Sequence, residues 1–258
     1  MGDTEIVHNG TKLYFRGERI FNAVMQELLQ KGMGKAKNAL LAGSSARGIA
    51  ATLYCDRFRG LLPNACRVKC LSDAAYFFPS RRFKDDGDLF IPYFKGLIAQ
   101  HGSVNSLPKS CTSRLSPYLC FFPQNVQQDI KTPIFFLMSA FDKVQINYIF
   151  PKHKETITAC LHSQNCSTEM IKAMQELRLE LLSVLPKQDN TSSRGILITS
   201  ETVHEQIRYL AWNSNRVVDG SNETISKMFT DWYFDGKVVQ VIDKYLCPYN
   251  CSHVQDNI

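Results

Sequence analysis

The chain has 258 residues, of which 44% are apolar and 21% are charged, a size that suits one large domain or two small ones with a buried core. Since no stretch reaches the roughly 18 consecutive apolar residues of a membrane span, we expect no membrane-spanning segment. The net charge of +6 suits an acidic polysaccharide, a membrane surface or nucleic acid, but scattered cations without interleaved aromatic residues make nucleic acid the least supported partner.

Hydrophobic periodicity predicts strands that alternate with helices. In chain order we expect a helix over 14–33, a first strand over 39–42, a helix over 49–58, a strand over 67–72, a short helix over 93–100, a loop over 102–119, a strand over 133–138, a loop-rich insertion, a helix from Thr168, a strand over 195–199, a helix over 225–233 and a final strand over 238–242. This alternation indicates an α/β fold with a mostly parallel sheet. Ligands of such sheets bind at the carboxyl ends of the strands.

A small-residue turn joins the first strand to its helix, with Ser45 at the apex between Gly43 and Gly48. This arrangement is typical of a nucleophile elbow, in which the backbone N–H of the next residue, Ala46, stabilises the oxyanion. The usual glycine two residues after the serine is replaced by Arg47. By itself the stretch is equally compatible with an ordinary turn between a strand and a helix.

Two further polar residues follow predicted strands and complete a candidate catalytic triad. Asp142 and His204 come after Ser45 in the order serine, acid, histidine that α/β-hydrolases use. In this interpretation Ser45 attacks an acyl carbonyl, His204 accepts and returns the proton, and Asp142 orients the imidazole.

Each of these assignments has an alternative. Asp73 also ends a strand and could be the acid, or it could accept hydrogen bonds from backbone amides beside the site. His101 and His253 are the alternatives to His204, which we favour because the preceding strand fixes its position. No metal ion or organic cofactor is required by this chemistry, and a zinc site is poorly supported because no Cys-x-x-Cys or His-x-x-x-His pair occurs.

The nine cysteines and five glycosylation sequons are typical of a secreted protein. Short loops could be closed by Cys111–Cys120, Cys160–Cys166 and Cys247–Cys251, and the sequons begin at Asn9, Asn165, Asn190, Asn222 and Asn250. The first residues carry no signal peptide. From this combination and the odd number of cysteines we expect that the chain lacks an N-terminal portion.

Several motifs resemble those of the plant pectin acetylesterases, which are relatives of the Notum carboxylesterases. The similar segments cover residues 13–17, 39–48, 55–58, 68–74, 111–114, 120–124 and 231–235. The resemblance implies a secreted cell-wall enzyme with an α/β-hydrolase-like fold, here one domain over 1–258 that forms the C-terminal part of the family domain, without its early strands. It implies a serine esterase that removes acetyl groups from pectin, with Ser45, Asp142 and His204 at the catalytic positions.

The sequence departs from the family pattern around the site. Ser44 replaces a cysteine, Arg47 replaces a glycine, and Glu201 and Glu205 replace two cysteines near His204. The two carboxylates are expected to raise the basicity of the histidine. The family's Gly-Gly-Gly-Trp-Cys segment, which supplies a second oxyanion donor, does not occur in the chain.

We therefore predict a monomeric esterase whose partner is acetylated pectin, with no lysine or arginine assigned to substrate binding. The alternative is a catalytically impaired relative that at most binds acidic polysaccharide. Hydrolysis of lipid esters, as in the Notum relatives, is a third possibility that matches the surrounding motifs less closely.

Overall fold

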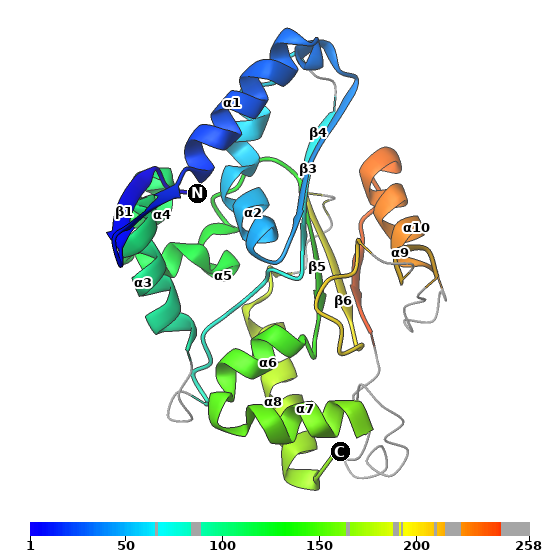
Figure 1. Ribbon diagram of the computed structural model, residues 1–258. Helices are drawn as coiled ribbons and strands as arrows, with labels where there is room; N and C mark the ends of the chain where they lie inside the picture. Colours follow the sequence, from blue (N-terminus) through cyan, green and yellow to red (C-terminus); the bar gives the residue numbers. More distant parts are fainter. Residues whose placement is uncertain are drawn as a thin grey trace.

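The central sheet consists of five parallel strands in the order β3-β4-β5-β6-β7. The computed structural model describes residues 1–64, 67–83, 89–163, 166–187, 191, 193–208, 211–214 and 223–243. The strands are β3 (Asn38–Ser44), β4 (Arg67–Asp73), β5 (Ile134–Ser139), β6 (Arg194–Thr199) and β7 (Gln240–Ile242). The predicted α/β class with a parallel sheet flanked by helices is confirmed (Figure 1).

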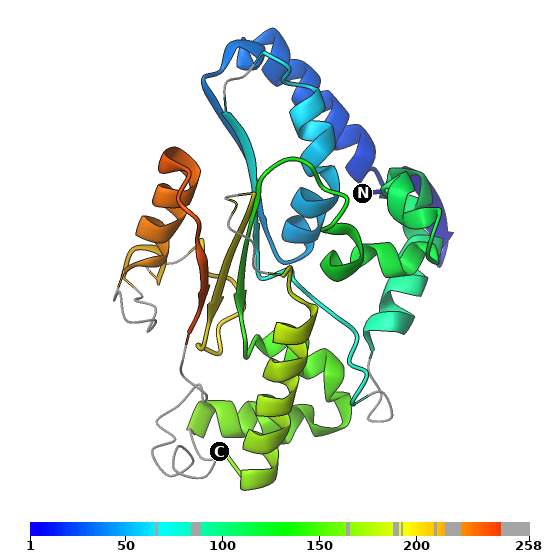
Figure 2. The ribbon, with the colours of Figure 1, turned by 180° about the vertical axis from the view of Figure 1, so that it is seen from behind.

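Helices cover both faces of this sheet, because successive residues of a strand point to opposite faces. Ile134, Phe136 and Met138 of β5 pack in the larger core, and the intervening Phe135 and Leu137 pack in a second core. The larger core contains α2 (Ala46–Gly60), α3 (Phe90–His101) and α8 (Thr168–Val184), and the second contains α10 (Ile225–Thr230) and the π-helix η6 (Asp231–Asp235). These two layers appear on opposite sides of the strands in Figure 2.

A β-hairpin precedes the sheet, so the prediction that residues 39–42 form the first strand was wrong. Strands β1 (Thr4–His8) and β2 (Thr11–Phe15) pair antiparallel around Asn9-Gly10, and both turn residues have positive φ. An Asn-Gly pair is the strongest short hairpin signal in a sequence. The hairpin is mostly exposed, which explains why its apolar alternation is weak. Asn9 also begins one of the five sequons, and it is exposed at this turn. The asparagines of the other four sequons lie outside the described residues.

Helix α1 (Gly17–Gln30) differs from its prediction in which apolar residues it buries. Met25 is buried and packs with Phe21 in a small core beside β3. Ile20, Val24 and Leu28, which helical spacing places on one apolar face with Phe21 and Met25, are exposed. Three apolar side chains spaced four residues apart therefore form a second stripe on this helix, which faces solvent.

The segments predicted as loops contain short helices. The stretch after Gly102 forms η3 (Ser103–Ser106), α4 (Lys109–Thr112) and η4 (Pro117–Phe121), and the insertion after β5 forms α6 (Lys143–Ile149), η5 (Pro151–His153) and α7 (Lys154–Ser163). The remaining elements are η1 (Met33–Lys35), α5 (Pro123–Val126) and α9 (Ala211–Ser214). None of the helices within the described residues is both long and apolar enough to cross a bilayer.

Disulfides link Cys111 to Cys120 and Cys160 to Cys166, as predicted. A further bridge, Cys55–Cys70, joins α2 to β4 and was not predicted, because its partners belong to different elements. The predicted Cys247–Cys251 pair lies outside the described residues.

Candidate active site

Ser45 occupies a one-residue turn between β3, which ends at Ser44, and α2, which begins at Ala46. Its φ of 57° and ψ of −127° are uncommon for a residue with a side chain. The turn is held by hydrogen bonds on both sides, because Ser45 N–H donates to Asp73 O at 2.9 Å and Ile49 N–H donates to Ser45 O at 3.1 Å. A strained serine between a strand and a helix is the geometry of a nucleophile elbow.

Two glycines allow the turn to close, and neither is at the position of Arg47. A Cβ on Gly43 would lie 2.3 Å from Arg47 O, and a Cβ on Gly48 would lie 2.7 Å from Asp73 O. The Arg47 side chain is exposed. Close packing therefore requires glycine three residues after Ser45, whereas a long side chain two residues after it reaches solvent.

The fold brings Ser45, His204 and Asp142 together, although they are far apart in the sequence. His204 Nε2 lies 2.7 Å from Ser45 Oγ, and His204 Nδ1 lies 2.7 Å from Asp142 Oδ2. Asp142 caps α6 and also accepts hydrogen bonds from the backbone N–H groups of Val144 and Gln145 at 2.8 and 3.0 Å. Its carboxylate is thereby fixed with one oxygen toward the imidazole.

The charges around His204 favour its protonated form. Burial alone would lower the pKa of His204, but the hydrogen bond and the charge of Asp142, together with Glu205 and Asp73, raise it above the ordinary value. For Asp142, complete burial raises the pKa, and the hydrogen bonds from His204 and two backbone amides act in the opposite direction. A histidine with raised basicity is well suited to accept a proton from a serine.

Asp73 lies beside this group but does not contact the imidazole. Its carboxylate accepts hydrogen bonds from Ser44 Oγ at 2.7 Å, Gln206 N at 3.0 Å and Ile207 N at 3.3 Å. The second of the two roles considered for Asp73, accepting backbone amides beside the site, is the one that the structure shows. Asp73 thus connects the residue before Ser45 to the residues after His204.

The other histidines considered from the sequence are not in this arrangement. The ring of His101 stacks on Phe15 at 4.1 Å, at the end of α3, and His253 lies outside the described residues. The contribution of Gln206 was not anticipated. Its N–H anchors the histidine loop to Asp73, and its side-chain oxygen accepts a hydrogen bond from Thr199. No sequence motif marks such a contact.

Ala46, predicted as an oxyanion donor, is the first residue of α2 and lies next to Ser45. The N–H groups of the first helical turn have no intrahelical acceptor, and the helix dipole adds partial positive charge there. Ala46 is exposed, so its N–H lies at an open end of the helix. Among the described residues, no three histidine, cysteine, aspartate or glutamate side chains are grouped as a metal site would require.

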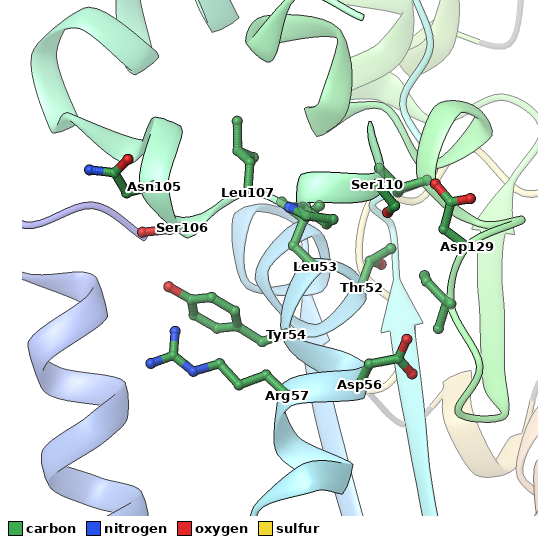
Figure 3. Close-up of a pocket in the computed structure, with 13 residues that line it drawn as sticks. Thr52, Leu53, Tyr54, Asp56, Arg57, Asn105, Ser106, Leu107, Ser110 and Asp129 are labelled. Carbon is green, nitrogen blue, oxygen red and sulfur yellow. The ribbon is translucent and has the colours of Figure 1, made fainter. Parts of the chain in front are cut away.

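A cavity of about 280 Å³ lies between α2 and the segment 105–110 (Figure 3). None of the three triad residues lines it. Polar groups at its wall are engaged within the protein: Tyr54 Oη and Arg57 bind Glu18, and Asp129 pairs with Arg114. It is therefore separate from the candidate active site.

The family model described as Pectinacetylesterase matches residues 1–254. The chain belongs to the pectinacetylesterase family. It is 39% identical over 253 residues to pectin acetylesterase 7 of Arabidopsis thaliana, covering 96% of this chain and 64% of that protein. It is 37% identical over 248 residues to pectin acetylesterase 11 of the same plant, covering 94% and 63%.

More distant similarity extends to animal proteins. Palmitoleoyl-protein carboxylesterase notum2 of Xenopus laevis is 30% identical over 146 residues, which cover 51% of this chain and 29% of that protein. The recognition of the family, with the Notum carboxylesterases as relatives, is confirmed. The chain spans slightly less than two thirds of the length of the plant relatives that it matches.

Proposed function

We propose that this protein is a serine carboxylesterase that removes acetyl groups from pectin in the plant cell wall, acting as a monomer. The observation that supports this most directly is the chain of hydrogen bonds from Ser45 through His204 to Asp142. A nucleophile bonded to a base, which is oriented in turn by a third group, is the arrangement that nucleophilic catalysis requires. The names of the plant relatives support pectin as the substrate.

The reaction proceeds in two steps. Ser45 Oγ attacks the acetyl carbonyl carbon while His204 Nε2 accepts the hydroxyl proton, and the resulting oxyanion is stabilised by the N–H of Ala46. The C–O bond to the sugar then breaks, the sugar oxygen takes the proton from His204, and an acetyl-serine remains. Water, deprotonated by His204, attacks this ester, and acetate leaves as the proton returns to Ser45.

Asp142 acts through the imidazole in both steps. Its carboxylate holds the proton on Nδ1, so that Nε2 faces Ser45 as the acceptor. It also stabilises the imidazolium that forms when the serine proton is transferred. Replacement of this acid by asparagine in a triad costs about 10,000-fold in kcat, because the imidazole then adopts the wrong tautomer.

The test is acetate release from acetylated pectin by the purified chain and by Ser45→Ala. We expect release by the wild-type chain and loss of nearly all of it in the variant, whereas Ser113→Ala, at an exposed serine of another segment, should retain full activity. A serine-directed fluorophosphonate should add its mass to a peptide that contains Ser45. Equal release by wild type and Ser45→Ala would refute the proposal.

A second candidate is a non-catalytic protein that binds acidic polysaccharide. The observation that favours it is the exposed guanidinium of Arg47, two residues from Ser45, where a polyanion could bind without reaction. In that case oligogalacturonate would bind the chain, but no acetate would be released. Restoring the family residue with Arg47→Gly would then leave acetate release undetectable.

A further inference from the structure

The sheet has a stagger at the end opposite Ser45. The β4 strand pairs with β3 from Arg67 onward, but its ladder with β5 begins only at Cys70, opposite Ile134. In Figure 1, β3 and β4 accordingly extend above the beginning of β5. A cavity of about 370 Å³ occupies this stagger.

Four cationic residues line this cavity, and we call them the cationic notch: Arg59, Arg67, Lys69 and Lys131. Val68, Thr132 and Pro133 complete its wall, so no carboxylate is among the described residues that line it. One acid lies near it, since Asp56 accepts hydrogen bonds from the backbone N–H groups of Lys131 and Thr132. Among the described residues, Arg67, Lys69 and Lys131 thus give the wall of this cavity an excess of positive charge.

The two cations on β4 are held in place by neutral groups. Arg67 donates to Asn38 Oδ1 at 3.0 Å and to Phe234 O at 3.1 Å. Lys69 donates to Trp232 O at 2.6 Å, and its Nζ lies 4.3 Å from the centre of the Trp232 ring. These contacts fix the positions of both groups and leave their positive charges uncompensated.

This arrangement has an electrostatic cost. Lys69 is 9% exposed, and burial together with the charge of Arg67 lowers its pKa. A bound anion would relieve the repulsion and would find donors already oriented. Lys131 is exposed, and therefore a ligand can reach the cavity from solvent.

We propose that the cationic notch binds carboxylates of a uronate chain, as an anchoring site separate from Ser45. The notch lies at the start of β4, whereas Asp73, which contacts the nucleophile turn, ends the same strand. Six residues of strand correspond to about 20 Å, so a chain bound at the notch is held without occupying the reaction centre. The choice of a uronate rests on the proposed function; the anion chemistry rests on the notch itself.

The test measures binding of de-esterified oligogalacturonate by calorimetry to the wild-type chain, to Lys131→Glu and to Lys12→Glu. Lys12 is exposed on the hairpin and provides the same charge change at a distant site. We expect Lys131→Glu to weaken binding about fivefold at low salt and Lys12→Glu to change it less than twofold, with added salt weakening wild-type binding. Arg67→Gln provides a second variant that removes a cation from the wall.

Inorganic sulfate, inorganic phosphate and a fully methyl-esterified oligogalacturonate form the comparison series. Binding of the charged oligomer that depends on Lys131, without comparable binding of the neutral one, supports the proposal. Equal affinity of wild type and Lys131→Glu, equal binding of the neutral oligomer, or binding of sulfate and phosphate alone would overturn it.

Kinetics separate this inference from the proposed function. With esterase activity present, Lys131→Glu should raise KM for polymeric acetylated pectin about fivefold and leave KM for 4-nitrophenyl acetate unchanged. An absence of esterase activity would refute the esterase, and charge-dependent oligogalacturonate binding by that inactive chain would still support the notch. An active esterase whose pectin KM and oligogalacturonate affinity do not respond to Lys131 would refute the notch alone.

Discussion

Ser45 shows how a single residue can be fixed in an unfavourable conformation by its neighbours. Its positive φ carries a cost of about 1–3 kcal/mol, which is offset by the hydrogen bonds of the turn and by the packing of Gly43 and Gly48. The result is a hydroxyl that points away from the sheet toward His204. At this scale the decisive quantities are hydrogen-bond distances and the protonation state of one imidazole.

The raised pKa of His204 predicts the pH dependence of catalysis. The base must be neutral to accept the proton of Ser45, so kcat/KM should decrease as the pH falls through a value above 6.5, the ordinary pKa of histidine. Because Glu205 is one of the groups that raise this pKa, Glu205→Gln should move the acidic limb of the profile to lower pH. Glu27→Gln, at an exposed position of α1, should leave it in place.

The raised pKa of His204 also makes the free energy of unfolding depend on pH. Its pH trend is opposite to that of activity, which increases as the pH rises through this pKa. A histidine whose pKa is raised on folding stabilises the protein below its unfolded pKa, and this contribution is lost as the pH rises through the folded pKa.

An acidic limb of the kcat/KM profile at or below pH 6.5 would contradict the assignment of His204 as a base supported by Asp142, Glu205 and Asp73.

Asp73 predicts a positioning effect that can be separated from simple loss of structure. Gln206 N–H faces both carboxylate oxygens of Asp73, at 3.0 and 3.2 Å. In Asp73→Asn one of these oxygens becomes an NH2 group that opposes this donor, and the negative charge is lost, so the contact to the histidine loop should weaken at a cost of about 1–3 kcal/mol. We expect kcat to fall about tenfold with little change in KM, as one lost interaction of this size predicts. Since the charge of Asp73 also raises the pKa of His204, the acidic limb should shift to lower pH.

Ser44→Ala is the matched control for this effect. It removes one donor to Asp73 and leaves the carboxylate and its contacts to the histidine loop. The kinetic pH profile of this variant should therefore match that of the wild type. An Asp73→Asn variant with an unshifted profile and normal kcat would show that the contact is structural only.

At the scale of elements, the site depends on how closely α2 packs against β3 and β4. Gly48 lies where a Cβ would be 2.6 Å from the Ala75 Cβ and 2.9 Å from Gly43 O. Helix α2 therefore approaches the sheet at its first turn, and the N–H groups of that turn lie beside Ser45. The same helix is fixed to β4 by Cys55–Cys70.

Gly48→Ala tests this packing. The added methyl group must displace backbone atoms of the sheet, so we expect a loss of about 1–3 kcal/mol in the free energy of unfolding and a reduced kcat. Gly60→Ala is the matched control in the same helix, because a Cβ there meets nothing within 4 Å. That variant should be neutral or slightly more stable, as judged by denaturant unfolding.

For the whole molecule, the disulfides limit how far the chain can unfold. Cys55–Cys70 spans 15 residues and connects two elements of the core, whereas Cys160–Cys166 spans only 6 residues. Both sulfur atoms of the longer bridge belong to fully buried residues. Its removal therefore affects the core as well as the unfolded chain.

Replacing both Cys55 and Cys70 with alanine should lower the free energy of unfolding by about 3 kcal/mol, the loop-closure value for a separation of this length. The equivalent double substitution at Cys160 and Cys166 should cost less, because its loop is shorter. Denaturant titrations of the two variants and the wild type provide the comparison. Equal stability of all three proteins would contradict the assigned role of the longer bridge.

Much of the molecule follows from local sequence patterns. The apolar runs at 39–42, 67–72, 133–138 and 195–199 predicted the strands, and the order of Ser45, Asp142 and His204 after those strands predicted which side chains would meet. The Cys111–Cys120 and Cys160–Cys166 bridges followed from short spacing. The hairpin around Asn9-Gly10 is also encoded locally, by the Asn-Gly pair at its turn.

Only the tertiary structure decided what depends on residues distant in the chain. Asp73 and Gln206 are 133 positions apart, and their contact arises because the end of β4 and the loop after β6 meet at the carboxyl ends of the strands. Ile20 and Met25 have similar apolar character, yet only Met25 finds a partner surface. The sequence by itself thus determined the strands of the central sheet, the long helices between them and the family, because periodicity and short motifs are local. The tertiary structure decided the contacts of Asp73 and the cationic notch, because strand register and packing bring distant residues together.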